Sequence, residues 1–219
     1  MTKKIFIALA ALALVMPLYP QDKGAEKKEK KPDDKIVVWQ EVALEDFETT
    51  PYTDKDVSYS HSSDQEANLS IRTDAPATAA SKKYLGLKIR TRGSDTFVIR
   101  PPRDIVLENY CKAISIWVYG ENTHGEISIM IQDVNETNHR LVMVPVINFL
   151  GWKQFTVLLT DKIYQGNVFQ TRKKTIKLMN IQYRTTMATG KTSGLEYVYL
   201  DDITATVKEH KGSKQNDQW

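Results

Sequence analysis

The sequence has little of three things that often reveal the class of a protein: cysteine, net charge and catalytic motifs. The single cysteine, Cys111, excludes an internal disulfide framework and a cysteine-based structural zinc cluster. Lys and Arg number 30 against 27 Asp and Glu, so the formal net charge is only +3. A dedicated nucleic-acid-binding protein usually has a clear basic excess, so no nucleic-acid partner is expected. The apolar content of 41% is that of an ordinary folded protein.

Enzyme and metal-site motifs are also missing. The segment Thr185–Thr192 (TTMATGKT) ends like a phosphate-binding loop, but it has Thr185 where that loop needs glycine. The segment Asp133–Asn138 begins like a calcium-binding EF-hand loop, but its sixth position is not glycine. The 4 histidines have no metal-ligand spacing, and no G-x-S-x-G sequence occurs. We therefore expect a non-enzymatic protein in which both segments form turns between strands.

Only one long apolar run is present, and it lies at the N-terminus. Lys3 and Lys4 precede the run Ile5–Val15, and Pro17 follows it. This order is typical of a secretory signal peptide, and the run is too short for a membrane-spanning helix. We predict a signal peptide at residues 1–20 and export from the cytoplasm, with an uncleaved membrane anchor as the alternative. The mature chain is then expected to be soluble, without a transmembrane segment.

Two polar segments flank the rest of the chain. Residues 21–35 are nearly all charged, so we expect a flexible arm, which acts as a solvated spacer or, alternatively, as a partner-binding tail. Residues 209–219 are polar and are expected to fray. The folded domain is therefore predicted at residues 36–208. Cys111, the lone cysteine of an exported protein, is expected to be buried rather than reactive.

Strand-like segments recur through this domain at short spacing, separated by turn residues. They are Ile36–Val42, Leu69–Thr73, Tyr84–Arg90, Thr96–Arg100, Lys112–Tyr119, Glu126–Val134, Arg140–Val146, Lys153–Leu159, Ile176–Arg184 and Leu195–Val207. Only Asp161–Thr175 is a candidate for a short helix. About ten strands in one domain of this length predict an all-β fold, a two-sheet antiparallel β-sandwich or jelly roll.

Several of these segments alternate between two faces. In Lys112–Tyr119, the side chains of Ile114, Ile116 and Val118 point one way. In Ile176–Tyr183, the same spacing places one face at Ile176, Leu178, Asn180 and Gln182. Alternation with one apolar face predicts antiparallel sheets that pack on a core.

Acidic motifs open and close the predicted domain, at Leu44–Glu48 and Tyr199–Ile203. The first and last strands of a sandwich are often neighbours, so we expect the two motifs to lie close together. Two acidic clusters repel each other unless a hard cation such as Ca²⁺ lies between them. The candidate ligands of such a structural calcium ion are Asp46, Glu48, Asp201 and Asp202. The alternative is two solvated turns with separate cationic partners, and no cofactor is required.

Aromatic side chains are candidates for a sugar-binding platform, since flat rings stack on pyranose faces. The available residues are Trp39, Trp117, Trp152, Tyr183, Tyr197 and Tyr199. The alternative is that these rings pack in the core or along the sheets, as aromatic residues in strands commonly do.

Three segments together resemble one known family. They are LEDFE at Leu44–Glu48, NFLGWKQFTVLL at Asn148–Leu159 and YVYLDDITA at Tyr197–Ala205. In an exported chain of this length they resemble the FlaA family, the periplasmic flagellar filament outer-layer, or sheath, proteins of spirochaetes. The resemblance extends over about residues 42–207, and the Gly-Trp-Lys sequence is its most specific part. The opening and closing motifs also resemble those of carbohydrate-binding-module jelly rolls, where analogous acidic residues hold a structural calcium ion.

The resemblance implies a non-enzymatic, structural role. The protein would coat the flagellin core in the periplasm beside other sheath proteins and would affect filament shape, stiffness and cell motility. A basic bias in the first half of the chain gives candidate interface residues for an acidic neighbour, with a solvated face as the alternative. These residues are Arg72, Lys88, Arg90 and Arg92. A secreted carbohydrate-binding module and a periplasmic enzyme of another type are the two other hypotheses.

Overall fold

The computed structural model describes residues 39–59, 65–91, 93–159, 163–166, 175–186 and 194–208. The predicted signal peptide, arm and C-terminal tail lie outside these residues, as do Arg92 and most of the candidate helix Asp161–Thr175. In the described part of the chain, no helix has the length and apolar character needed to cross a membrane. Because the predicted flanking segments lie outside the described residues, the domain boundaries stay predictions.

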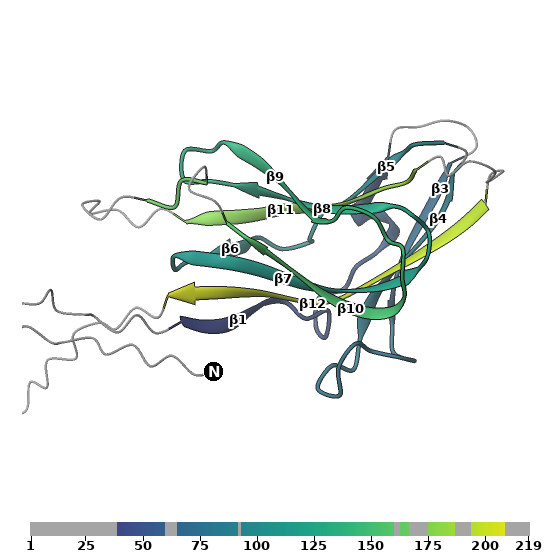
Figure 1. Ribbon diagram of the computed structural model, residues 1–219, viewed down its shortest axis with the longest axis horizontal. Helices are drawn as coiled ribbons and strands as arrows, with labels where there is room; N and C mark the ends of the chain where they lie inside the picture. Colours follow the sequence, from purple (N-terminus) through teal and green to yellow (C-terminus); the bar gives the residue numbers. More distant parts are fainter. Residues whose placement is uncertain are drawn as a thin grey trace, which may run out of the picture. The chain divides into compact units, whose positions relative to one another are not determined.

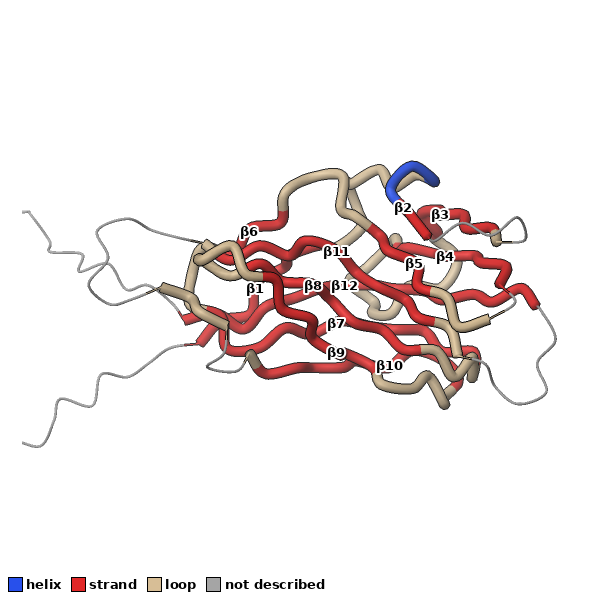
Figure 2. The backbone as a smooth tube through the Cα atoms, turned by 90° about the horizontal axis from the view of Figure 1, so that it is seen from above, coloured by secondary structure: helices blue, strands red, loops and turns tan. Residues whose placement is uncertain are grey.

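Two six-stranded antiparallel sheets make up the described domain and lie in two layers (Figure 1). Sheet A contains β1 (Trp39–Glu45), β3 (Glu66–Arg72), β4 (Tyr84–Thr91), β7 (Cys111–Glu121), β10 (Leu150–Leu158) and β12 (Gly194–Lys208). Sheet B contains β2 (Val57–Tyr59), β5 (Thr96–Ile99), β6 (Ile105–Leu107), β8 (Glu126–Gln132), β9 (Asn138–Val144) and β11 (Ile176–Arg184). A short 3-10 helix, η1 (Asp54–Asp56), precedes β2 and lies beside it in Figure 2. The predicted all-β sandwich is confirmed, and each predicted strand overlaps a strand of the structure.

Sheet A follows the order β10-β7-β12-β4-β3, with β1 also paired to β12. Sheet B follows the order β2-β5-β11-β8-β9, with β6 also paired to β11. The first and last strands are therefore neighbours, as expected, with Glu45 opposite Ile203. A bulge separates the two halves of β12, since its pairing with β7 shifts between Asp201 and Thr204. Asp202 has a φ of 39°, in the left-handed region, and this conformation marks the bend.

The core lies between the sheets and is built by alternation. In β7, the predicted face of Ile114, Ile116 and Val118 is fully buried. Burial of each such side chain contributes roughly 1.5–3 kcal/mol, so one strand alone contributes substantially to stability. Trp117 and Tyr119 point away from the core and are only partly buried. We call this second face, which continues onto the neighbouring strands, the outer face of sheet A.

Candidate functional site

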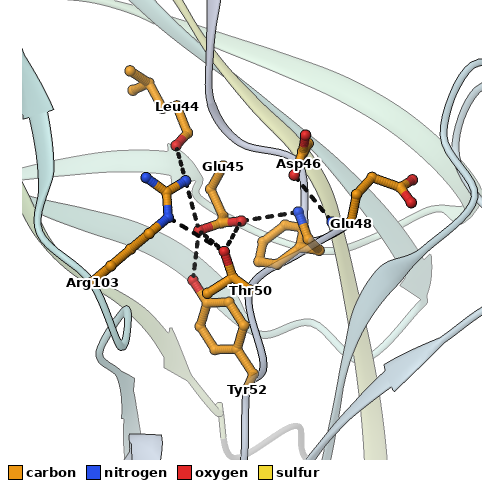
Figure 3. A network of polar contacts seen from close by, with 8 residues as sticks. Leu44, Glu45, Asp46, Glu48, Thr50, Tyr52 and Arg103 are labelled. Atoms are coloured by element: carbon orange, nitrogen blue, oxygen red, sulfur yellow. Dashed lines mark hydrogen bonds and ion pairs between the residues drawn. The ribbon is translucent and has the colours of Figure 1, made fainter.

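The opening motif is organised by a carboxylate buried at the end of β1 (Figure 3). The side chain of Glu45 has no exposed surface. Its oxygens accept hydrogen bonds from the Phe47 backbone N–H at 3.0 Å, the Thr50 hydroxyl at 3.0 Å and the Tyr52 hydroxyl at 3.5 Å. The Arg103 guanidinium lies 3.2 Å from Glu45 Oε2. A buried charge is costly without such partners, so Glu45 serves as a structural centre of this motif.

Glu48 holds one end of the β3–β4 loop, residues 73–83. Its Oε1 atom accepts hydrogen bonds from the backbone N–H groups of Lys82 at 2.5 Å and Lys83 at 3.0 Å. The Lys83 ammonium donates to the backbone carbonyl of Glu48 at 2.6 Å. The Lys82 amide, more than any other contact, lowers the pKa of the Glu48 carboxyl. Glu48 is therefore ionised at neutral pH and tied to the loop.

The closing motif holds the middle of the same loop. Asp201 Oδ2 accepts a hydrogen bond from the Ala77 backbone N–H at 2.9 Å, and its Oδ1 accepts from the Ser81 hydroxyl at 3.2 Å. The Thr78 hydroxyl donates to Asp202 Oδ2 at 3.4 Å. Both acidic motifs thus converge on residues 73–83, which are far from either of them in sequence.

Each predicted calcium ligand accepts at least one hydrogen bond from a protein group in this arrangement. Burial raises the pKa of Asp202, and the negative charges of Asp46 and Glu48 raise it further, so the motifs do repel each other as expected. Burial also raises the pKa of Asp201. Among the described residues, no three side chains of His, Cys, Asp or Glu are placed to hold a metal ion. Calcium binding stays a prediction, and the donor set does not fit a preformed site.

The six aromatic residues of the predicted sugar platform have different environments. Tyr183 is buried in the core, where its hydroxyl donates to Glu196 Oε2 at 2.8 Å. Trp39 lies near one end of the domain, 6.3 Å from the ring of Tyr110, with the Lys112 ammonium 5.3 Å from its own ring centroid. In the described part of the chain, neither ring contacts another of the six candidates. Trp117, on β7, is partly buried and, within the described residues, likewise has no ring contact with the other candidates.

Trp152, Tyr197 and Tyr199 do come together, on the outer face of sheet A. Two further rings join them, Tyr84 and Tyr119, which the sequence did not single out. The centroid of Trp152 lies 5.4 Å from those of both Tyr84 and Tyr119. The centroid of Tyr199 lies 5.6 Å and 5.7 Å from the same two rings. The four rings therefore close a cycle of edge-to-face contacts.

A cavity of about 150 Å³ opens above these rings. Its lining consists of Asp74, Ala75, Tyr84, Tyr119, Glu121, Trp152 and Tyr199. We call it the aromatic cavity. The Trp152 indole N–H donates to the backbone carbonyl of Ala75 at 2.8 Å, so the β3–β4 loop forms one wall. Glycine at position 86 leaves room for the neighbouring ring, because a Cβ there would lie 3.3 Å from Tyr199 Cδ1.

Charges at the edge of the aromatic cavity are fixed by pairing. The Arg72 guanidinium donates to both carboxylate oxygens of Asp74, at 3.2 and 3.1 Å, and lowers the pKa of Asp74 to about 2. The Tyr84 hydroxyl donates to Asp74 Oδ1 at 2.8 Å. Burial raises the pKa of Tyr84 to about 12. At neutral pH the cavity therefore has an ionised carboxylate and a protonated phenol.

Three of the four candidate interface residues lie on the same outer face. Arg72 is on β3, and Lys88 and Arg90 are on β4, where both are exposed. Arg90 lies 3.5 Å from Glu66, and Arg72 is paired as described, so two of these positive charges already have acidic partners within the chain. Arg92 lies outside the described residues.

Comparison with known proteins identifies the family. The model of the FlaA flagellar filament outer layer protein family matches residues 58–211. The chain belongs to the FlaA family. A relative in Brachyspira hyodysenteriae (strain WA1), named as a flagellar filament outer layer-like protein, is 31% identical over 130 residues. That match covers 58% of this FlaA-family chain and 59% of the relative, so the chain spans about three fifths of the relative's length.

Solved structures similar to this FlaA-family protein include carbohydrate-binding modules. One belongs to the β-sandwich superfamily of these modules, with a TM-score of 0.47 and 13% identity over 74% of this chain and 60% of that chain. Another is the family 11 module of a cellulosomal cellulase of Clostridium thermocellum, with a TM-score of 0.45 and 13% identity over 79% of this chain and 98% of that chain.

Proposed function

We propose that this protein is a structural, non-enzymatic component of the outer layer, or sheath, of the periplasmic flagellar filament. It coats the flagellin core in the periplasm beside other sheath proteins and contributes to filament shape, stiffness and cell motility. The family match over residues 58–211 carries the proposal, because that span includes most of both sheets.

The edges of the sandwich support a role in lateral contacts. β10 lies at one end of sheet A, and an edge strand presents unpaired backbone groups to a neighbouring chain. Leu150 and Leu158, the first and last residues of β10, are 80% and 62% exposed. Apolar side chains exposed along an edge are suited to packing against another subunit.

The outer face of sheet A supports a second kind of contact. We propose that Lys88 and Arg92, with Arg72 and Arg90, dock on an acidic neighbour in the sheath. Complementary charge of this kind favours encounter and orientation more than affinity, and salt weakens it. Arg72 and Arg90 already have acidic partners, so among the described residues Lys88, which is exposed on β4, carries most of this proposal.

Co-sedimentation with purified filaments tests the docking proposal. We expect the paired substitution Lys88→Glu and Arg92→Glu to weaken co-sedimentation at least tenfold at low salt. Lys177→Glu, on sheet B, is the matched control and should bind like the wild type. Equal binding by all three proteins would exclude docking through these residues.

Deletion of the gene tests the sheath role itself. We expect periplasmic flagella from the deletion strain to be thinner and differently curved in electron cryotomograms, and complementation to restore them. Unchanged diameter and curvature would contradict a structural role in the sheath, whatever the result with the charge variants.

A further inference from the structure

We propose that the aromatic cavity binds one sugar unit of a glycan. The proposal rests on the rings and carboxylates of the cavity and is independent of the sheath role. It assigns Trp152, Tyr119 and Tyr199 to apolar contact with the sugar ring, and Asp74 and Glu121 to hydroxyl recognition.

Strand register builds the floor of the cavity. Trp152 on β10 lies directly opposite Tyr119 on β7, and Tyr119 lies directly opposite Tyr199 on β12. The three rings form one apolar row across the sheet, in which neighbouring rings meet edge to face at interplanar angles of 78° and 77°. Such a row suits contact with the C–H groups of a pyranose, because burial of apolar area against a preformed surface is favourable.

The ring packing argues against a cation as the ligand. Recognition of a quaternary ammonium group uses aromatic rings that stand apart and surround the charge. Here the neighbouring centroids are 5.4–5.7 Å apart in edge-to-face contact, so each ring fills the space beside the next. The rings therefore form a packed apolar floor of alternating ring faces and edges, rather than a cage around a charge.

Polar groups at the rim match sugar hydroxyls. The carboxylates of Asp74 and Glu121 line the cavity and accept hydrogen bonds, while the tyrosine hydroxyls both donate and accept. Because the pKa of Asp74 is held near 2 by Arg72, this carboxylate is an acceptor at every physiological pH. A volume of about 150 Å³ corresponds to one sugar unit rather than a long chain segment. A ligand with an apolar face and hydroxyl edges fits this combination.

The cavity wall is fixed before any ligand arrives. Asp201 holds Ala77 and Ser81, and the Trp152 indole holds Ala75. The side chain that forms the floor is thus bonded to the loop that forms the wall. Preorganisation of this kind lowers the entropy cost of binding. It also gives the buried carboxylate of Asp201 a role beyond folding.

Isothermal titration calorimetry provides the test, because its signal does not depend on Trp152, the residue that is substituted. The purified protein is titrated with soluble hexasaccharides of glucose, galactose, xylose and N-acetylglucosamine, and with choline as the cationic probe. We expect at least one hexasaccharide to bind saturably with a Kd below about 1 mM, and choline not to bind. Trp152→Ala should weaken that binding at least tenfold, and Trp152→Phe, which keeps a ring, should weaken it less.

Trp39→Ala is the matched control, since it removes a tryptophan of sheet A outside the cavity and should bind like the wild type. If Trp152→Ala does not fold, Glu121→Gln, at an exposed position, should still weaken binding several-fold. Binding to a glycoprotein is measured before and after periodate oxidation of its sugars. Binding that is lost on oxidation shows recognition of protein-attached glycans, as distinct from free polysaccharides. Three outcomes would overturn the proposal. The first is binding of choline alone, and the second is the absence of saturable binding by any saccharide probe. The third is equal binding by the Trp39→Ala, Trp152→Ala and Glu121→Gln variants.

Discussion

Individual acidic residues in this protein act mainly on their own chain. Glu45 accepts bonds from three neighbours and pairs with Arg103, while Asp201 and Glu48 hold the β3–β4 loop. The sequence marked these motifs as acidic and as close together. It did not show which carboxylates turn inward, because their partners at Ala77, Lys82 and Arg103 lie far away along the chain.

Removal of the Glu45 carboxylate should destabilise the protein. We expect Glu45→Ala to lower the free energy of unfolding by about 2 kcal/mol, since several buried donors lose their acceptor. Asp46→Ala is the control, because Asp46 accepts only a local bond from the Glu48 backbone N–H. Urea denaturation measures both, and equal losses would contradict a central role for Glu45.

The ion pair of Asp74 predicts a defined pH dependence. Because the pKa of Asp74 in the folded protein, about 2, is below its ordinary value of 3.8, ionisation of this carboxyl stabilises the fold above about pH 4. That contribution is lost as the pH falls toward 2. We expect Arg72→Gln to raise the pKa of Asp74, as measured by NMR titration of its side-chain carboxyl. An unchanged titration would show that Arg72 does not control this group.

Strands were predictable from the sequence where the alternation of buried and outward-facing side chains is uninterrupted. The face of Ile114, Ile116 and Val118 in β7 was predicted correctly. In β11, the predicted face was wrong after Leu178, because the pairing with β8 shifts at that point and places Ile181 and Tyr183 in the core. A bulge depends on the partner strand, so one strand's sequence does not reveal it.

Very short elements also escaped prediction. β2 and β6 have 3 residues each, too few to show a period of two. Both pair along an edge of a longer strand whose register positions them. Their existence therefore depends on the assembled sheet rather than on local sequence.

The β3–β4 loop should depend on Asp201 for its order. We expect Asp201→Ala to speed hydrogen exchange at the Ala77 amide at least tenfold, because that N–H loses its acceptor. The amide of Ile116, in the core strand β7, should exchange at its original rate, as an internal control. Unchanged exchange at Ala77 would show that other contacts hold the loop.

For the whole molecule, the pattern of strands predicted the sandwich, and three motifs pointed to the FlaA family. The aromatic cavity was only partly predictable. Trp152 and Tyr199 were candidates, but Tyr84 and Tyr119 join them only through the order and register of four strands. That order is a property of the fold and is not encoded in the spacing of the aromatic residues.

The lone thiol reports on the integrity of the whole domain. Cys111 is fully buried, as expected, and burial raises its pKa to about 11. We expect no reaction with a thiol reagent in the native protein at neutral pH, and complete reaction in urea. A Lys55→Cys variant, at an exposed position, should react at once as a control. Rapid labelling of Cys111 in the native protein would contradict the packing around β7.

Recovery of the protein with purified filaments tests the central claim most directly. Periplasmic flagella are sheared from the source organism, purified and quantified by mass spectrometry against the remaining periplasmic fraction. The proposed sheath role predicts abundant recovery of this chain with flagellin, in constant proportion across preparations. Its absence from the filaments, with the protein free in the periplasm, would contradict that role.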